Sequence, residues 1–360
     1  MAKIDAFFKL MNDQGASDLH MVSGLPPALR INGEIERVKY KVLGNDELRG
    51  MLYEIAPEDK IKEFEETGDV DFGYEISGLA RYRANFFMQK NGIGAVFREI
   101  PSTILTIEQL GLPSVIGKLA MLPRGLVLVT GPTGSGKSTT LAAIIDEANR
   151  KRKDHIITIE DPIEFVHKSQ GCIVNHREVG AHTKSFSTAL RGALREDPDI
   201  ILVGEMRDLE TISLAIEAAS TGHLVFGTLH TSSASKTVDR IVEVFPANEQ
   251  PQIKSTLADS IRAVVAQVLF KRTDQKGRVA ALEIMIASPA VRNLIREGKT
   301  YQIPSSIQTG KQYGMQLIDD AIMDHLQRGI ISGDDAYAKA NSKAKFREYI
   351  KNPPKDFTEV

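Results

Sequence analysis

The sequence predicts an α/β protein in which a smaller α+β module precedes a larger core with a mostly parallel sheet and C-terminal helices. From Gly125 onward, short apolar runs rich in β-branched residues alternate with helical segments, the pattern of a sheet covered by helices on its faces. Before residue 100, short strand-like runs are instead separated by turn residues. A length of 360 residues suits two domains better than one.

The composition excludes several classes of protein. Hydrophobic residues make up 42% and charged residues 26%, as in soluble globular proteins, and a net charge of −2 gives no global basic field for nucleic acid or anionic lipid. The single cysteine, Cys172, excludes an internal disulfide framework and a Cys-cluster zinc site, and we expect it to be buried. No stretch is long enough to span a bilayer, and Asp5 and Lys9 interrupt the place of a signal peptide. We therefore expect a cytoplasmic protein.

The first 100 residues are expected to form the small α+β module. Ile4, Phe7, Phe8 and Met11 fall on one face of a helix, and residues 46–66 are expected to be helical and charged. The expected strands cover 28–31, 35–38, 70–76, 80–89 and 94–100, with turns at Pro26-Pro27 and Asn32-Gly33, and a linker follows over 101–123.

The expected strands of the core each end in polar residues. These strands cover 126–130, 156–160, 200–204, 224–229 and 279–286. Since ligands of parallel sheets bind at the carboxyl ends of the strands, we expect one nucleotide site there. Beyond Ser288 the chain is expected to be helical, with breaks at Pro304, Gly310 and Gly333 and a loose tail from Asn352.

One glycine-rich segment fits the phosphate-binding loop of nucleotide hydrolases. It reads Gly131-Pro132-Thr133-Gly134-Ser135-Gly136-Lys137-Ser138, is preceded by an apolar strand, and leads through Thr139 into a helix. Glycines let backbone N–H groups approach the phosphates, Lys137 would reach the β- and γ-phosphates, and the Ser138 hydroxyl would hold Mg²⁺. We therefore expect residues 131–139 to bind ATP with Mg²⁺.

Acidic residues follow two of the expected strands. Glu205 comes after residues 200–204, in the place of the Walker B acid, and is the expected second metal ligand beside Ser138. Asp161 and Glu164 follow residues 156–160, and the turn expected at Pro162 can bring Glu164 over the phosphates to orient water. The alternative is a solvated loop with scattered acids.

Histidine and arginine residues are further candidates. His230 directly follows residues 224–229 and can donate a hydrogen bond to the γ-phosphate, whereas His223, before the same strand, is equally well explained as structural. Arg83 and Arg98 of the small module can supply positive charge to the phosphates. Solvated arginines on an edge strand are the alternative for this pair.

Four motifs along the chain closely resemble those of the secretion ATPase superfamily, the hexameric motors of type II secretion and type IV pili. They follow one another in the sequence as they do in that superfamily. Residues 194–208 resemble its signature, 159–164 its acidic box, 221–231 its histidine box, and 16–27 its N-terminal motif. Within the superfamily the chain resembles the PilT-like pilus retraction ATPases. It begins almost directly at the small module, lacks paired C-x-x-C motifs, and carries at 290–297 a segment similar to a motif tied to retraction, with Val291 in place of Ile.

The resemblance implies both an architecture and a function. It implies a PAS-like N-terminal domain over 1–100, a linker over 101–123, a RecA-like ATPase domain over 124–288, and a C-terminal helical region and tail over 289–360. It also implies Glu164 as catalytic base, Glu205 on the metal side, and Arg83 and Arg98 as phosphate-sensing arginines, with Arg81 as a substitute. The implied protein is a homohexameric motor for pilus retraction, pilin depolymerisation and twitching motility. It would act on an inner-membrane platform protein through peripheral membrane association, without direct nucleic-acid binding.

Three alternatives remain open at this point. A sister motor of the same superfamily would drive pilus extension, type II secretion or DNA uptake. A nucleic-acid translocase would share the core, although the near-neutral charge and the lack of an aromatic and basic stripe argue against it. A regulatory nucleotide-binding module would show negligible turnover. For a motor, we expect the linker to let the two domains rotate when ATP is hydrolysed.

Overall fold

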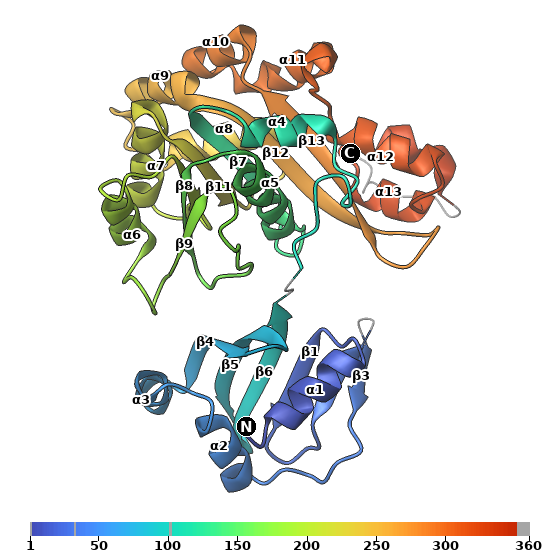
Figure 1. Cartoon of the computed structure of the whole chain (residues 1–360). Helices are drawn as coiled ribbons and strands as arrows, with labels where there is room; N and C mark the ends of the chain where they lie inside the picture. The colour runs from blue at the N-terminus through green and yellow to red at the C-terminus, as the bar shows by residue number, and fades with distance from the viewer. Residues whose placement is uncertain (1, 32–33, 101–102, 351–360) are drawn as a thin grey trace. The chain divides into compact units, whose positions relative to one another are not determined.

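The computed structural model describes residues 2–31, 34–100 and 103–350, which form two compact units. The first unit comprises Met1–Thr103 together with Pro162–Val166, and the second comprises Ile104–Asp161 and His167–Val360. Figure 1 labels most of the helices and strands of each unit. The turn expected at Asn32-Gly33, the start of the expected linker at Pro101-Ser102 and the tail from Asn352 lie outside the described residues.

The first unit is an antiparallel sheet with helices packed against it. Its strand order is β3-β2-β1-β6-β5-β4. Leu19, Tyr82 and Phe97 are buried on one face of the sheet, where Phe8 of the N-terminal helix packs on Tyr82 and Phe97 at ring-centroid distances of 4.3 and 5.0 Å. The elements are α1 (Asp5–Asp13), β1 (Asp18–Val22), β2 (Ala28–Ile31), β3 (Glu34–Arg37), α2 (Asn45–Tyr53), α3 (Glu58–Thr67), β4 (Asp69–Ile76), β5 (Ala80–Gln89) and β6 (Gly92–Ile100).

The helical character of residues 46–66 is confirmed apart from one break, and one strand of the first unit was missed. Residues 46–66 form two helices, because Pro57 lacks an N–H group and takes an extended conformation at the N-cap of α3. Strand β1 was missed, although it pairs with both β2 and β6 in the middle of the sheet. The single face of Ile4, Phe7, Phe8 and Met11 is confirmed, because all four side chains are buried.

The second unit contains a seven-stranded sheet in the order β13-β12-β7-β11-β10-β8-β9. All neighbouring pairs are parallel except β12 and β13, which confirms the mostly parallel class. β13 is antiparallel because only a short turn, residues 272–277, joins it to β12. Strands β9 and β12 were missed. The strands are β7 (Gly125–Thr130), β8 (His155–Glu160), β9 (Ile173–Glu178), β10 (Ile200–Val203), β11 (Leu224–Leu229), β12 (Ile261–Lys271) and β13 (Arg278–Ile286).

Helices cover both faces of this sheet (Figure 1). α4 (Ser114–Ala120) and α5 (Lys137–Lys151) pack on one face, against side chains such as Val127 and Val265. The opposite face, with Leu128 and Val264, is covered by α6 (Phe186–Ala193), α7 (Leu209–Thr221), α8 (Ala234–Glu243), α9 (Gln250–Ser260), α10 (Pro289–Glu297) and α11 (Ile303–Thr309). Because successive strand residues point to opposite faces, alternate apolar residues fill two separate cores.

The C-terminal helices form a smaller core with the far ends of β12 and β13. This core buries Phe270, Ile322 and Phe346. Its elements are α12 (Ile318–Gln327), α13 (Gly333–Lys339) and the 3₁₀ turn Lys343–Tyr349, with two shorter 3₁₀ turns earlier at Thr300–Gln302 and Lys311–Tyr313. Gly310 follows α11 as expected, but Pro304 lies in the first turn of α11 and Gly333 begins α13, so both start helices rather than break them.

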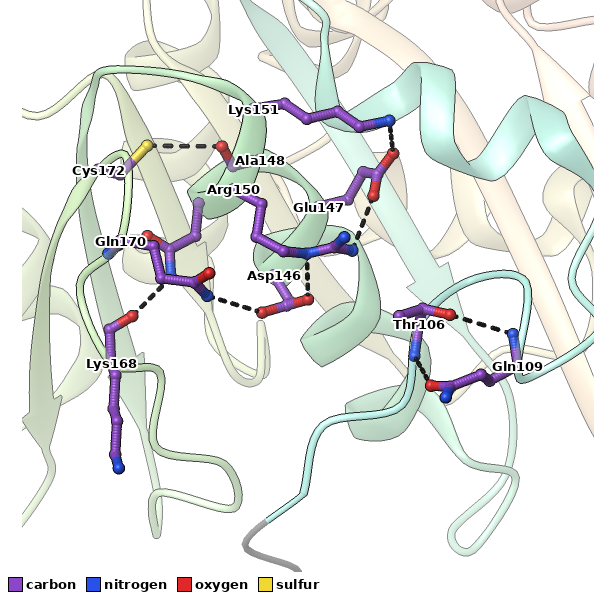
Figure 2. A network of polar contacts seen from close by, with 11 residues as sticks. Thr106, Gln109, Asp146, Glu147, Ala148, Arg150, Lys151, Lys168, Gln170 and Cys172 are labelled. Atoms are coloured by element: carbon purple, nitrogen blue, oxygen red, sulfur yellow. Dashed lines mark hydrogen bonds and ion pairs between the residues drawn. The ribbon is translucent and has the colours of Figure 1, made fainter.

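Polar contacts fix the C-terminal half of α5 (Figure 2). Arg150 Nε lies 2.8 Å from Asp146 Oδ2, and Gln170 Nε2 donates to Asp146 Oδ1 at 3.3 Å. Cys172 is buried, as expected, and its Sγ donates to the Ala148 carbonyl at 3.5 Å. The helix that begins at the phosphate loop is therefore anchored at its other end. Within the described residues, no helix has the length and apolar character needed to cross a bilayer.

Candidate nucleotide-binding site

The carboxyl ends of the parallel strands bring the polar segments of the second unit to one edge of the sheet. The glycine-rich loop follows β7, Asp161 follows β8, Glu205 follows β10, and His230 directly follows β11. These strands are neighbours in register, with Val203 opposite both Ile159 and Gly227. Residues far apart in the sequence therefore meet where ligands of parallel sheets bind.

The glycine-rich loop has backbone conformations that favour glycine. Gly131, Gly134 and Gly136 have φ angles of +144°, +78° and +86°. Gly136 is the N-cap of α5, and no side chain caps this end of the helix. The first-turn N–H groups of α5 are therefore donors for an anion, in the positive field of the helix dipole. A Cβ atom on Gly134 would meet no atom within 4 Å, so this side of the loop is open.

The Lys137 side chain folds back onto the loop. Its Nζ donates to the carbonyl groups of Gly131 at 2.9 Å and Pro132 at 3.2 Å. Ser138 and Thr139 follow in the first turn of α5 and are half-buried. A cation, a hydroxyl and uncapped amides are a donor set that fits a polyphosphate.

Glu205 is held by two basic side chains. Its Oε1 lies 2.8 Å from His230 Nε2 and is also paired with Arg207 Nε. Burial favours a higher pKa for Glu205, but the hydrogen bonds from Arg207 and His230 outweigh it and lower its pKa. Glu205 is therefore a carboxylate at the edge of the sheet.

Arg207 is a residue of this site that the sequence reasoning missed. Its side chain is 73% exposed, its hydrogen bond to Glu205 raises its pKa, and the charge of Asp161 adds to that effect. The signal was present in the sequence, because Arg207 follows Glu205 by two residues directly after a buried strand.

His223 lies at the opposite edge of the sheet from His230. The six-residue strand β11 separates them, which corresponds to about 20 Å of extended chain. His223 Nδ1 lies 3.0 Å from the carbonyl oxygen of Ala218, near the end of α7. His223 is therefore explained by this structural contact. Of the two histidines, only His230 lies at the carboxyl ends of the strands, with the other polar residues of the site.

Two stacked histidines lie beside the end of β8. The rings of His167 and His176 are 5.8 Å apart between centroids and 16° from parallel. The His167 backbone N–H donates to His176 Nε2 at 3.1 Å, and His176 Nδ1 lies 2.7 Å from Thr158 Oγ1. Burial, together with the neighbouring His176, lowers the pKa of His167 to about 4.

The remaining candidates belong to the first unit. Glu164 lies in Pro162–Val166, the segment that groups with that unit. Arg83 and Arg98 are directly opposite each other on β5 and β6. Arg83 Nε contacts Asp71 Oδ1 at 3.3 Å, and Arg98 Nε contacts the buried Asp18 Oδ1 at 2.9 Å. The roles of Glu164, Arg83 and Arg98 toward a nucleotide stay predictions.

Comparison with known proteins gives consistent matches. A family model described as "Type II/IV secretion system protein" matches residues 95–345. The chain is 55% identical over 333 residues to "Type IV pilus retractation ATPase PilT" of Pseudomonas aeruginosa, covering 92% of this chain and 96% of that protein. It is 52% identical over 316 residues to a "Twitching motility protein" of Neisseria gonorrhoeae, covering 88% and 84%. A crystal structure of the pilus retraction motor PilT with bound ADP matches with a TM-score of 0.89 at 43% identity, covering 96% of this chain and 98% of that one. The similarity therefore extends over both units.

Proposed function

This chain belongs to the type II/IV secretion ATPase family, and we infer that it is a pilus retraction ATPase. It hydrolyses ATP and uses the energy to withdraw type IV pili, which produces twitching motility. The observation that carries this inference is the 55% identity to a named retraction ATPase over 92% of the chain. The glycine-rich loop at the carboxyl edge of the sheet supports it, because its donors suit a nucleotide.

The residues of the second unit fit a nucleotide with Mg²⁺. Residues 131–139 would hold the phosphates, and Ser138 and Glu205 would supply oxygen ligands to Mg²⁺, which neutralises phosphate charge when bound. Among the described residues, no group of three or more His, Cys, Asp or Glu side chains could hold a metal ion by itself. Mg²⁺ commonly relies on one or two protein ligands and on the phosphates of the substrate.

The side chains act on ATP by positioning and charge stabilisation. Lys137 exchanges the carbonyl groups of Gly131 and Pro132 for the β- and γ-phosphates, because anionic oxygens are stronger acceptors. Glu164 takes a proton from the attacking water, and His230 senses the γ-phosphate through a hydrogen bond. This step needs little covalent chemistry from the protein.

Arginines of the first unit would couple hydrolysis to movement. Arg83 and Arg98 each hold one carboxylate through Nε, and the rest of each guanidinium fork can bind phosphate oxygens. Loss of the γ-phosphate removes the charge that attracts them, so the PAS-like domain (residues 1–100) turns about the linker (101–123) relative to the RecA-like domain (124–288). The C-terminal helical region (289–360) would complete each subunit.

The motor would work as a homohexamer. ATP sites at subunit boundaries would convert successive hydrolysis steps into deformation of a ring, which acts on an inner-membrane platform protein at the base of the pilus. Membrane association would be peripheral, on the cytoplasmic side, and no direct contact with nucleic acid is needed.

Replacement of Lys137 tests this function. Lys137→Ala should weaken nucleotide binding and abolish Mg²⁺-dependent phosphate release by the purified protein, and a strain carrying it should keep long, non-retracting pili. The matched control is Lys151→Ala at the other end of α5, where Nζ pairs with Glu147 at 2.5 Å. Unchanged turnover in Lys137→Ala would remove the site assignment, and a deletion strain without pili would point to an extension motor.

A further inference from the structure

Gln267 of β12 lies directly behind the phosphate loop. β12 runs parallel to β7, and Ala266 is paired with Thr130, the residue before Gly131. Gln267 is therefore the next residue along β12, beside the first glycine of the loop. Its side chain is 2% exposed and lies on the face that α5 covers, together with Val265.

The Gln267 side chain bridges the loop and the helix that follows it. Its Nε2 donates to the Ser135 carbonyl at 2.6 Å, and its Oε1 accepts from Thr140 Oγ1 at 2.8 Å. Both hydrogen bonds are buried. A buried amide with a fixed donor and a fixed acceptor holds both partners in one arrangement, because a broken contact would leave a polar group unpaired.

Two loop glycines are packed against the same residue. A Cβ atom on Gly131 would lie 2.3 Å from the Gln267 carbonyl oxygen, and one on Gly136 would lie 2.9 Å from Gln267 Nε2. The loop therefore rests on β12 at both its first and its last glycine.

We propose that Gln267 is a positioning residue that sets the direction of the phosphate-binding amides. The peptide unit between Ser135 and Gly136 is planar and trans, so its N–H points opposite to its C=O. Because Gln267 fixes the Ser135 carbonyl toward β12, the Gly136 N–H is turned away from β12 and toward the nucleotide side of the loop. Gln267 also fixes the first turn of α5 through Thr140. This inference rests on the proposed nucleotide function of the loop.

Two substitutions at Gln267 separate hydrogen bonding from packing. Gln267→Met keeps the length of the side chain but removes both hydrogen bonds, and should weaken ADP binding about tenfold. Gln267→Glu should bind ADP almost normally when its carboxyl group is protonated, because the acid can donate to Ser135 and accept from Thr140. The ionised form sets two oxygen atoms against each other, so affinity should fall as the pH rises through a pKa that burial raises. Gln267→Met should lack this pH dependence.

The measurements are the Kd for a fluorescent ADP analogue against pH, and hydrogen exchange of residues 131–140 in the nucleotide-free protein. The matched control is Gln316→Met, which removes a 2.8 Å bond from Gln316 Nε2 to the Leu282 carbonyl in the same unit. Thr140→Val should weaken ADP binding and speed exchange in the loop, and Thr140→Ser should restore both.

The results of these measurements either support or overturn the proposed role of Gln267. Faster loop exchange with about tenfold weaker ADP binding in Gln267→Met, but not in Gln316→Met, supports the inference. An ADP affinity within twofold of wild type in Gln267→Met, or an equal loss in Gln316→Met, overturns it. If Gln267→Met does not fold, Thr140→Val and the pH profile of Gln267→Glu decide in the same way. Failure of the wild-type protein to bind ADP would instead reject the proposed function.

Discussion

Protonation of His167 should make the protein markedly less stable in mild acid. The pKa of this side chain is about 4 in the folded protein, against about 6.5 for an unperturbed histidine. Between these values the unfolded chain takes up a proton that the folded protein does not, so stability falls as the pH drops through this window. Above it both states are neutral, and below pH 4 both are charged, so the loss stops growing.

The size of the effect follows from the two pKa values. From pH 7 to pH 5, the His167 contribution to the free energy of unfolding should fall by about 2 kcal/mol, and the complete loss at lower pH is about 3 kcal/mol. For a unit of this size, each kcal/mol shifts the melting temperature by about 2–4 °C. The His167 part of the shift is therefore about 4–8 °C at pH 5.

Thermal unfolding of wild type and His167→Phe at pH 7 and pH 5 isolates this contribution. Phenylalanine keeps an aromatic ring beside His176 but cannot titrate, so the variant should lose about 2 kcal/mol less than wild type on acidification. Phe165→Leu is the matched control, because it changes a neighbouring buried side chain and leaves every histidine in place. Equal losses in wild type and His167→Phe would refute the assignment of a buried, neutral histidine.

Three other predictions concern the site. Glu164→Gln should retain ATP but slow hydrolysis by about 100-fold or more in single-turnover phosphate release, and normal hydrolysis would place the base elsewhere. Gly131→Ala should lower the free energy of unfolding in urea by about 3 kcal/mol or more, because its Cβ atom would lie 2.3 Å from a backbone oxygen. Gly134→Ala should lower it by only about 1 kcal/mol, because only its positive φ angle is unfavourable. Similar losses in the two variants would contradict the packing described. Arg83→Ala should lower the hydrolysis rate without preventing nucleotide binding, with the exposed Arg37→Ala as control, and equal rates in the two variants would reject a phosphate-sensing role.

The strands of the core were predictable where local signals were complete. Strands β7, β8, β10 and β11 are short apolar runs bounded by polar or glycine residues, and each was expected within one residue of its limits. Strand β12 was missed because it begins at Ile261 directly after α9 ends at Ser260, without a glycine or proline to mark the change. Strand β9 is a half-exposed edge strand, and its polar side chains obscure the alternation of apolar and polar residues that would predict a strand.

The candidate site was likewise predictable only where its signals are local in the sequence. The glycine-rich loop is a contiguous motif, so its sequence predicts its own structure and the helix after it. The contact of Gln267 with Ser135 joins residues 132 positions apart, and the pairing of Glu205 with His230 spans 25. Such pairs depend on strand order, which one sequence does not specify. Arg207 could have been found, because its position after Glu205 is a local signal.

The grouping of Pro162–Val166 with the first unit has a mechanical consequence. The polypeptide passes from one unit to the other three times, after Thr103, after Asp161 and after Val166. A single crossing would join the two units by one covalent connection, whereas each further crossing adds another covalent restraint. If the chain were cut only after Thr103, the N-terminal fragment would lack part of the first unit. The five residues Pro162–Val166 would stay on the C-terminal fragment. Fragments divided there should therefore reassemble poorly when they are produced separately.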